Sequence, residues 1–242
     1  MSDLFQTDTG ISVPSLTVGQ MREVDRIAVD HRTPNLYQMM ENAGRTLAEV
    51  VTARLGNDWT DIPISVLVGP GSNGAGGTVA ARHLANRGGV VSLIMSREPA
   101  PDTILDRQLD IYVETGGLVA DSLTDDSGLV VDALIGYGLD GEPRGVIDEM
   151  IASINESDVS VVSLDIPSGV DGDTGSAPGR AVVTDLTLTL ALPKPGLGAA
   201  RCGDIWLADL GIPLGVFKRA GVEVPPRIFE NGPLVHLNRR LS

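Results

Sequence analysis

The chain has 242 residues and a formal net charge of −14, and it contains one cysteine, Cys202. Such an acidic chain lacks the basic surface that nucleic acids and anionic membranes attract, and a single cysteine excludes both an internal disulfide and a cysteine-based structural metal site. Apolar residues make up 42% of the chain and aromatic residues 3%, which favours a core of aliphatic side chains, as in a sheet covered by helices.

The first ten residues are polar and acidic, without the basic and apolar regions of a secretion signal, and no apolar run reaches the length of a membrane span. We therefore expect a cytoplasmic protein with no membrane partner. Apolar residues at helical spacing over residues 16–55 predict two helices. Proline breaks a helix, so we place the break near Thr33 and Pro34, and Gly56 ends the second helix.

The next unit is a strand, a glycine-rich loop and a helix. Residues 64–68 form an apolar, β-branched run typical of a buried parallel strand, and the glycine-rich segment 69–77 follows at once. From Thr78, a candidate N-cap, helical spacing predicts a helix that stops at Gly88 and Gly89. Glycines let a ligand approach the backbone, and a helix N-terminus presents N–H groups that suit phosphates. The unit therefore predicts a phosphate-binding element.

The rest of the chain continues this alternation. Apolar runs predict strands at residues 90–95, 128–135, 159–166, 182–191 and 205–210, with helices at 103–115 and 146–155. Strands that alternate with helices favour an α/β fold with a mostly parallel, doubly wound sheet and right-handed crossovers. We interpret residues 1–242 as a single domain that ends in an irregular C-terminal tail over residues 214–242.

Polar side chains gather where three of these strands end, which is where ligands bind in such sheets. Asp132 lies inside the apolar run VVDALI, where an ionised carboxylate is costly unless it is paired. A cation would pair with it, and a set of oxygen ligands favours a hard ion; capping of a turn is the alternative. Asp165 is a candidate general acid or base, again with turn capping as the alternative. Ser72, Asn73 and Ser168 come from the same loops.

The glycine-rich segment also satisfies the G-x-G-x-x-G pattern of a dinucleotide-binding oxidoreductase, and Glu98 lies about where a ribose-binding acid is expected. That interpretation leaves Asp132, Asp165 and Ser168 without a role. A Walker-type phosphate loop is excluded because no Gly-Lys-Ser/Thr follows the glycines.

Residues 69–84 have the sequence GPGSNGAGGTVAARHL, which resembles the signature GPGNNGGDGLVAARHL of the NAD(P)H-hydrate epimerase family, the YjeF N-terminal domain family. Five further segments, in the same order, are similar to other landmarks of that family: MMENAG, VVDALIGYGL, LDIPSGVDGDTG, TLTLALPKPGL and GDIWLADLGIP. The resemblance covers about residues 16–213. It implies a Rossmann-like three-layer αβα sandwich, commonly a homodimer, that interconverts the R and S epimers of hydrated NADH and NADPH as a repair step.

The resemblance also implies a site. One potassium ion per subunit falls on Asn73, Asp132 and Ser168, and we assign Asp165 the acid/base role as a hypothesis. Lys194 is a candidate for holding phosphate or ordering the site, with packing as the alternative. The dinucleotide contacts fall on Ser72, Asn73, Gly74, Ala75, Gly76, Gly136, Tyr137, Gly138, Leu139, Asp140, Gly141, Glu142 and Asp165.

This chain departs from the family pattern at three places in the predicted site. Gly76 stands where the signature has an acid, Ser72 stands where it has an asparagine, and Asp140 and Glu142 add two acids to a segment that is usually uncharged or basic. The alternative function is therefore a catalytically weakened nucleotide- or metabolite-binding module. The 29 residues after Pro213 are too few for the dehydratase to which such chains are often fused, so we expect a separate downstream dehydratase.

Overall fold

A computed structural model describes residues 5–30, 34–198 and 202–239. These residues form one ten-stranded sheet in the order β2-β1-β10-β9-β8-β7-β6-β3-β4-β5. The strands are β1 Phe5–Thr7, β2 Ser12–Val13, β3 Ile64–Val68, β4 Val91–Met95, β5 Leu118–Ala120, β6 Leu129–Ala133, β7 Ser160–Leu164, β8 Leu186–Leu190, β9 Asp204–Ala208 and β10 Leu234–Arg239. The helices are α1 Val18–Asp30, α2 Leu36–Leu55, α3 Ser72–Asn86, α4 Ile104–Val113, α5 Val146–Glu156 and α6 Leu214–Arg219, with short 3-10 turns at Trp59–Asp61 and Pro195–Gly198.

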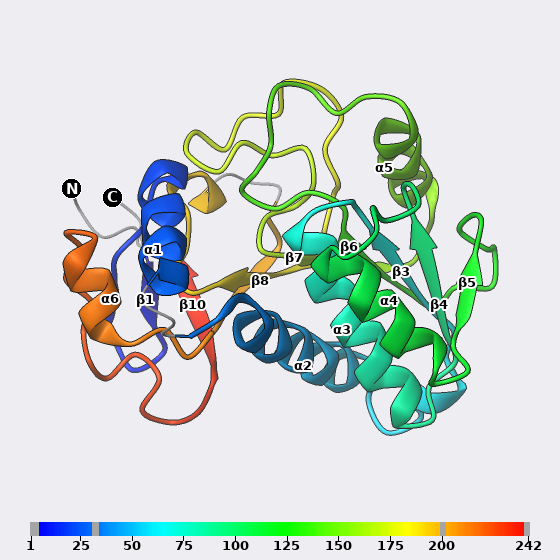
Figure 1. Ribbon diagram of the computed structural model, residues 1–242, viewed down its shortest axis with the longest axis horizontal. Helices are drawn as coiled ribbons and strands as arrows, with labels where there is room; N and C mark the ends of the chain where they lie inside the picture. Colours follow the sequence, from blue (N-terminus) through cyan, green and yellow to red (C-terminus); the bar gives the residue numbers. More distant parts are fainter. Residues whose placement is uncertain (1–4, 31–33, 199–201, 240–242) are drawn as a thin grey trace.

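The strands from β9 to β5 are parallel, and β10, β1 and β2 add an antiparallel flank. Helices α2, α3 and α4 lie on one side of the sheet and α5 on the other (Figure 1). Alternation along β3 explains the layers, because Val66 and Val68 pack with α2 and α3 while Leu67 packs with α5. The predicted α/β class and the mostly parallel sheet are confirmed.

The two predicted N-terminal helices are α1 and α2. Asn35 caps α2 in a reciprocal capping box with Gln38, and Gly56 ends that helix at a φ of 81°. Thr33 lies outside the described residues, whereas Pro34 precedes the cap. The N-terminus of α1 is capped by Thr17 and Gln20 in the same reciprocal way.

The predicted start of the third helix is wrong. Helix α3 begins at Ser72 rather than Thr78, so residues 72–77 of the glycine-rich segment are helical, and the Thr78 hydroxyl donates to the Gly74 carbonyl one turn earlier. Close packing explains this, since a Cβ on Gly74 would lie 1.9 Å from the carbonyl oxygen of Gly69 and one on Gly77 would lie 2.5 Å from the Ala133 Cβ. Tertiary packing therefore overrides the low helix propensity of glycine.

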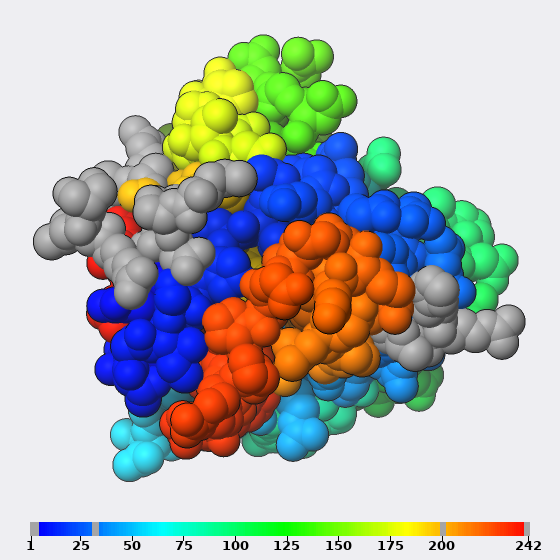
Figure 2. Space-filling view, turned by 90° about the vertical axis from the view of Figure 1, so that its left-hand side faces the viewer, coloured from blue at the N-terminus to red at the C-terminus, as the bar shows by residue number. Residues whose placement is uncertain are grey.

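The predicted irregular tail is also wrong over its described part, because it contains α6 and β10. Strand β10 pairs antiparallel with both β9 and β1, which ties the C-terminal segment to the N-terminal one. Figure 2 shows these blue and red segments side by side at one end of the molecule. Strands β1, β2 and β5 were not predicted, since each has only two or three residues. No helix in the described ranges is long and apolar enough to cross a membrane.

Candidate functional site

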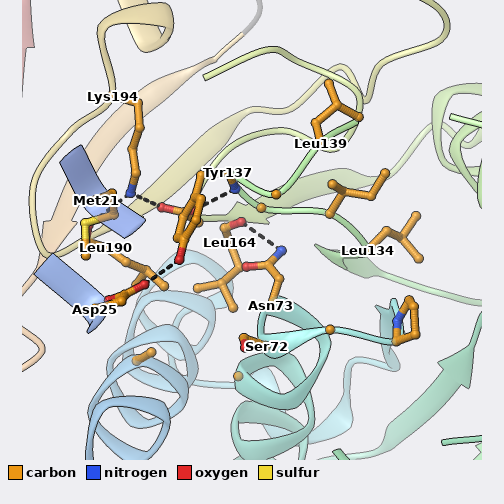
Figure 3. A pocket seen from close by; sticks show the side chains of 18 of the residues that line it. Met21, Asp25, Ser72, Asn73, Leu134, Tyr137, Leu139, Leu164, Leu190 and Lys194 are labelled. Atoms are coloured by element: carbon orange, nitrogen blue, oxygen red, sulfur yellow. Dashed lines mark hydrogen bonds and ion pairs between the residues drawn. The ribbon is translucent and has the colours of Figure 1, made fainter. Parts of the chain in front are cut away.

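A cavity of about 580 Å³ lies at the carboxyl ends of β3, β6, β7 and β8. Parallel strands present the loops that follow them at one edge of the sheet, so residues distant in sequence meet there. Helices α1 and α2 close the cavity from the side, through Met21 and Asp25 of α1 and Met39 and Met40 of α2. Figure 3 shows the side chains converging from these elements.

One side of the cavity, the glycine wall, is formed by residues 69–77, of which Pro70, Gly71, Ser72, Asn73 and Gly76 line the cavity. Helix α3 begins there, and the first N–H groups of a helix have no partner within it, so this wall presents donors to a ligand. The Asn73 amide nitrogen donates to the Leu164 carbonyl at 3.2 Å, which holds the side chain at the end of β7. Its oxygen faces Gly136, where an added Cβ would lie 3.1 Å away.

The other side, the ionisable wall, consists of Asp25, Tyr137, Asp165 and Lys194. Lys194 Nζ lies 2.5 Å from Asp165 Oδ1, and the two side chains are 1% and 4% exposed. Lys194 also donates to the Leu190 carbonyl at 3.1 Å, and the Tyr137 backbone N–H donates to Asp165 Oδ2 at 3.1 Å. Asp165 has a φ of 69°, in the left-handed region that non-glycine residues seldom adopt, so the surrounding contacts hold it in a strained conformation.

Tyr137 connects the two acids of this wall. Its ring lies under Lys194, with Nζ 5.6 Å from the ring centroid, and its hydroxyl donates to Asp25 Oδ2. In Figure 3 the Tyr137 side chain runs between Lys194 and Asp25, with its hydroxyl towards Asp25. Burial raises the pKa of both the Asp25 carboxyl and the Tyr137 hydroxyl, and the nearby Asp25 charge raises that of Tyr137 further.

Asp132 and Ser168 lie behind the cavity and are fully buried. The Asp132 carboxylate accepts from the Ser168 hydroxyl and backbone N–H, from the Ser163 hydroxyl and from the Leu134 backbone N–H. All four donors are neutral, and burial raises the pKa of Asp132. Asp132 therefore caps the turn after β6, as the alternative interpretation expects, while its charge has no cationic partner among these contacts.

The oxygen atoms around this carboxylate test whether a potassium ion fits. Ser168 Oγ lies 2.5 Å from Asp132 Oδ1 and 3.2 Å from the Ile135 carbonyl oxygen, while the Asn73 amide oxygen lies at the adjoining Gly136. Such a set of hard oxygen atoms around one negative charge suits an alkali or alkaline-earth cation and not a soft transition metal. No group of three or more histidine, cysteine and acidic side chains suited to a metal occurs among the described residues.

Most of the predicted contact residues line the cavity, namely Ser72, Asn73, Gly76, Gly136, Tyr137, Gly138, Leu139, Asp140, Glu142 and Asp165. Gly74 and Ala75 are instead buried inside α3, and Gly141 does not line the cavity. Asp25 was not predicted, although a signal was present. It shares one face of α1 with Met21 and Ala28, so it is an acid on an otherwise apolar helix face.

The comparisons with known proteins agree with one another. A family model described as YjeF-related protein N-terminus matches residues 36–196. The chain is 44% identical over 236 residues to an NAD(P)H-hydrate epimerase of Dehalogenimonas lykanthroporepellens, with 96% of each chain covered. A second NAD(P)H-hydrate epimerase, of Rhodopirellula baltica, is 32% identical over 88% of this chain and 90% of its own.

A longer relative and a solved structure complete the comparison. The chain is 38% identical to a bifunctional NAD(P)H-hydrate repair enzyme Nnr of Hyperthermus butylicus over 78% of its own length, and it spans 36% of that enzyme. The crystal structure of yeast ynu0, YNL200c, superposes with a TM-score of 0.79 at 20% identity, and the match covers 94% of this chain and all of the yeast chain. At that identity the likeness establishes the fold alone.

Proposed function

The chain belongs to the YjeF-related protein N-terminus family, and on that premise we propose that it interconverts the R and S epimers of hydrated NADH and NADPH. The observation that carries this proposal is the 44% identity to an NAD(P)H-hydrate epimerase along nearly the whole of both chains. The protein is thus an isomerase of nicotinamide nucleotide repair.

The cavity supports a dinucleotide substrate. The glycine wall offers backbone donors and the positive end of the α3 dipole to a pyrophosphate, and Arg144 on the rim adds a cation beside Asp140 and Glu142. Aliphatic side chains of α1, α2 and β8 provide apolar area for a nucleoside ring. We infer that the pyrophosphate binds at Ser72 and Asn73 and that the hydrated ring binds at the ionisable wall.

The carboxylate of Asp165 is the group that we assign to move a proton at the substrate hydroxyl. The carbon that bears this hydroxyl is bonded to the ring nitrogen, so its configuration can invert through a dehydrated or a ring-opened intermediate. Lys194 and the Tyr137 backbone N–H fix both carboxylate oxygens, and a fixed orientation is what efficient proton transfer requires. We accordingly interpret Lys194 as a residue that orders the site.

We further propose that one potassium ion binds at Asn73, Asp132 and Ser168. When bound, the ion compensates the buried charge of Asp132 and holds the loops after β3, β6 and β7 in register. The oxygen atoms around Asp132 and the lack of a cationic partner among its contacts support this assignment.

Four wider expectations are also proposals. We propose a cytoplasmic location, a homodimer, a single domain over residues 1–242, and a separate dehydratase that consumes the epimerised product. The bifunctional repair enzymes among the relatives support the last point, since they place two repair activities in one chain.

The test is to incubate the protein and potassium chloride with a single hydrate epimer and to follow its approach to the epimer mixture by chromatography. We expect acceleration over the uncatalysed rate, and a loss of about 100-fold or more in an Asp165→Asn variant. No acceleration overturns the epimerase proposal and favours the weakened binding module. A fully active Asp165→Asn variant overturns the choice of residue only.

A further inference from the structure

The ionisable wall contains a second carboxyl group that faces the same cavity as Asp165. We propose that Asp25 is the second acid/base residue of the epimerase, and that it gives the proton to the departing substrate hydroxyl while Asp165 activates the water that replaces it. This inference rests on the proposed function and extends it with a residue and a route. Asp25 comes from α1, far in sequence from every other polar residue of the wall.

The two acids have different electrostatic partners. Asp165 forms an ion pair with Lys194, which is the only lysine or arginine among the buried residues described here. Among the described residues no cation is in hydrogen-bond contact with Asp25, which accepts from the neutral Tyr137 hydroxyl. Acids that have different electrostatic partners in one site commonly divide the acid and base roles between them.

The groups that face Asp25 set its protonation. Burial raises its pKa most strongly; the Tyr137 hydrogen bond and the Lys194 charge lower it, and the Asp165 charge raises it, with a net rise. The charge of Arg22, on the same helix, lowers the pKa of the Tyr137 hydroxyl. A carboxyl group that keeps its proton to a higher pH than usual is suited to be a general acid, and an ion-paired carboxylate is suited to be a base.

Hydrogen bonds hold both partners of the contact between Asp25 and Tyr137 in place. The first turn of α1 is held by the Thr17 and Gln20 capping box, and the backbone N–H of Val18 donates to Asp173 Oδ1 at 2.7 Å, in the loop after β7. Tyr137 donates to Asp165 through its backbone and to Asp25 through its hydroxyl. One residue thus spaces the two carboxyl groups along the wall, and the proposed route requires the ring to bind with one face towards each of them.

The arrangement favours the dehydrated intermediate. Asp25 gives its proton to the substrate hydroxyl, the C–O bond breaks, water leaves, and the nitrogen lone pair forms a C=N bond that carries a positive charge. Asp165 then takes a proton from a water that adds to the opposite face of the carbon, and the C=N electron pair returns to nitrogen. The proton on Asp165 returns to Asp25 through solvent. No oxidant or reductant is needed, and two carboxylates beside one lysine suit the cationic ring.

The test compares the wild-type protein with Asp25→Asn and Tyr137→Phe, using Asp30→Asn as the matched control on the exposed face of α1. We expect Asp25→Asn to lower kcat about 100-fold, with little change in KM, and to remove the fall in rate at high pH. Asparagine keeps an acceptor for the Tyr137 hydroxyl, so the thermal midpoint should stay close to that of the wild type. Tyr137→Phe removes a hydrogen bond that favours the ionised form of Asp25, so the fall in rate should move to higher pH. Asp30→Asn should behave as the wild type does.

A second measurement follows the oxygen atom. In water enriched in ¹⁸O, each inversion through the dehydrated ring introduces one solvent oxygen into the product, so label and epimer should form at equal rates. Inversion without label overturns the route. An active wild type whose Asp25→Asn variant keeps its rate and its high-pH limb overturns the role of Asp25 alone. A wild type with no activity overturns the proposed function and this inference with it.

Discussion

The glycine wall of the cavity is made of backbone in close contact, whereas the ionisable wall is made of side chains that hold one another by charge and hydrogen bonds. In the first wall the carbonyl oxygens of Gly69 and Leu134 fill the space that a Cβ would need. In the second, Asp165 and Lys194 are buried as a pair. Substitutions at Gly69 and Gly74 of the first wall should therefore act on folding, and substitutions in the second wall should act on charge balance and catalysis.

The largest effect is expected from Gly74→Ala. Its Cβ would lie 1.9 Å from the Gly69 carbonyl oxygen, and a backbone atom cannot move aside as the end of a side chain can. We expect a loss of more than about 4 kcal/mol in the free energy of unfolding, or a protein that does not fold. Urea denaturation measures the free energy of unfolding. Gly71→Ala is the control, because no heavy atom of the described residues other than its chain neighbours lies within 4 Å of the Cβ it adds and φ is −101°. Equal midpoints for the two variants would show that the glycine wall is not sterically fixed.

The second-largest loss of stability is expected from Lys194→Met, which leaves the Asp165 carboxylate buried without its cation. Loss of one partner of a buried ion pair costs about 3 kcal/mol or more, chiefly through the uncompensated charge that remains. The double variant with Asp165→Asn should recover part of this loss, with a coupling of about 2 kcal/mol. Denaturant midpoints of the two single variants and the double variant measure the coupling. Additive losses would mean that the pair is not a unit.

A smaller effect is expected from potassium. If the ion binds at Asp132, then potassium at about tenfold its dissociation constant adds about 1.4 kcal/mol to the free energy of unfolding, and lithium chloride at equal ionic strength adds less. Asp132→Asn should abolish the difference between the two salts, while Asp25→Asn should keep it. Thermal midpoints in the two salts measure the effect. A wild-type midpoint that does not distinguish potassium from lithium contradicts the ion site.

The comparison of the walls also explains how much the sequence alone could predict. Buried runs such as residues 64–68 and 159–166 contain β3 and β7, because a parallel strand covered on both faces is mostly apolar. The start of α3 could not be predicted, since its glycines are helical only through contacts with Gly69 and Ala133, which are tertiary. Strand β10 has only one buried residue in six, so its local pattern was too weak to predict a strand.

The candidate site was predictable in part for a related reason. Residues at the carboxyl ends of strands, such as Asn73, Asp165 and Tyr137, must meet at one edge of a parallel sheet, and the structure brings them to one cavity. The position of Asp25 depends on how α1 crosses that edge, which no local pattern encodes. The burial of Lys194 against Asp165 depends on the turn after β8 in the same way.

The smallest effect is expected from Gly76→Asp, which restores the acid of the family signature to the glycine wall. An added Cβ would lie 3.0 Å from Leu164 Cδ2, the end of a flexible side chain that can shift by a few tenths of an ångström. We therefore expect a loss of about 1 kcal/mol or less in the free energy of unfolding, in contrast to Gly74→Ala two residues earlier. Because we assign proton transfer to Asp25 and Asp165, the epimerisation rate should stay within about threefold of the wild type, a change of about 0.65 kcal/mol in the barrier. Urea denaturation measures the free energy of unfolding and the chromatographic assay measures the rate, with Gly76→Ala as the steric control for both. A rise of tenfold or more with aspartate but not with alanine would mean that the missing acid of the glycine wall limits this enzyme, and that the ionisable wall does not replace it.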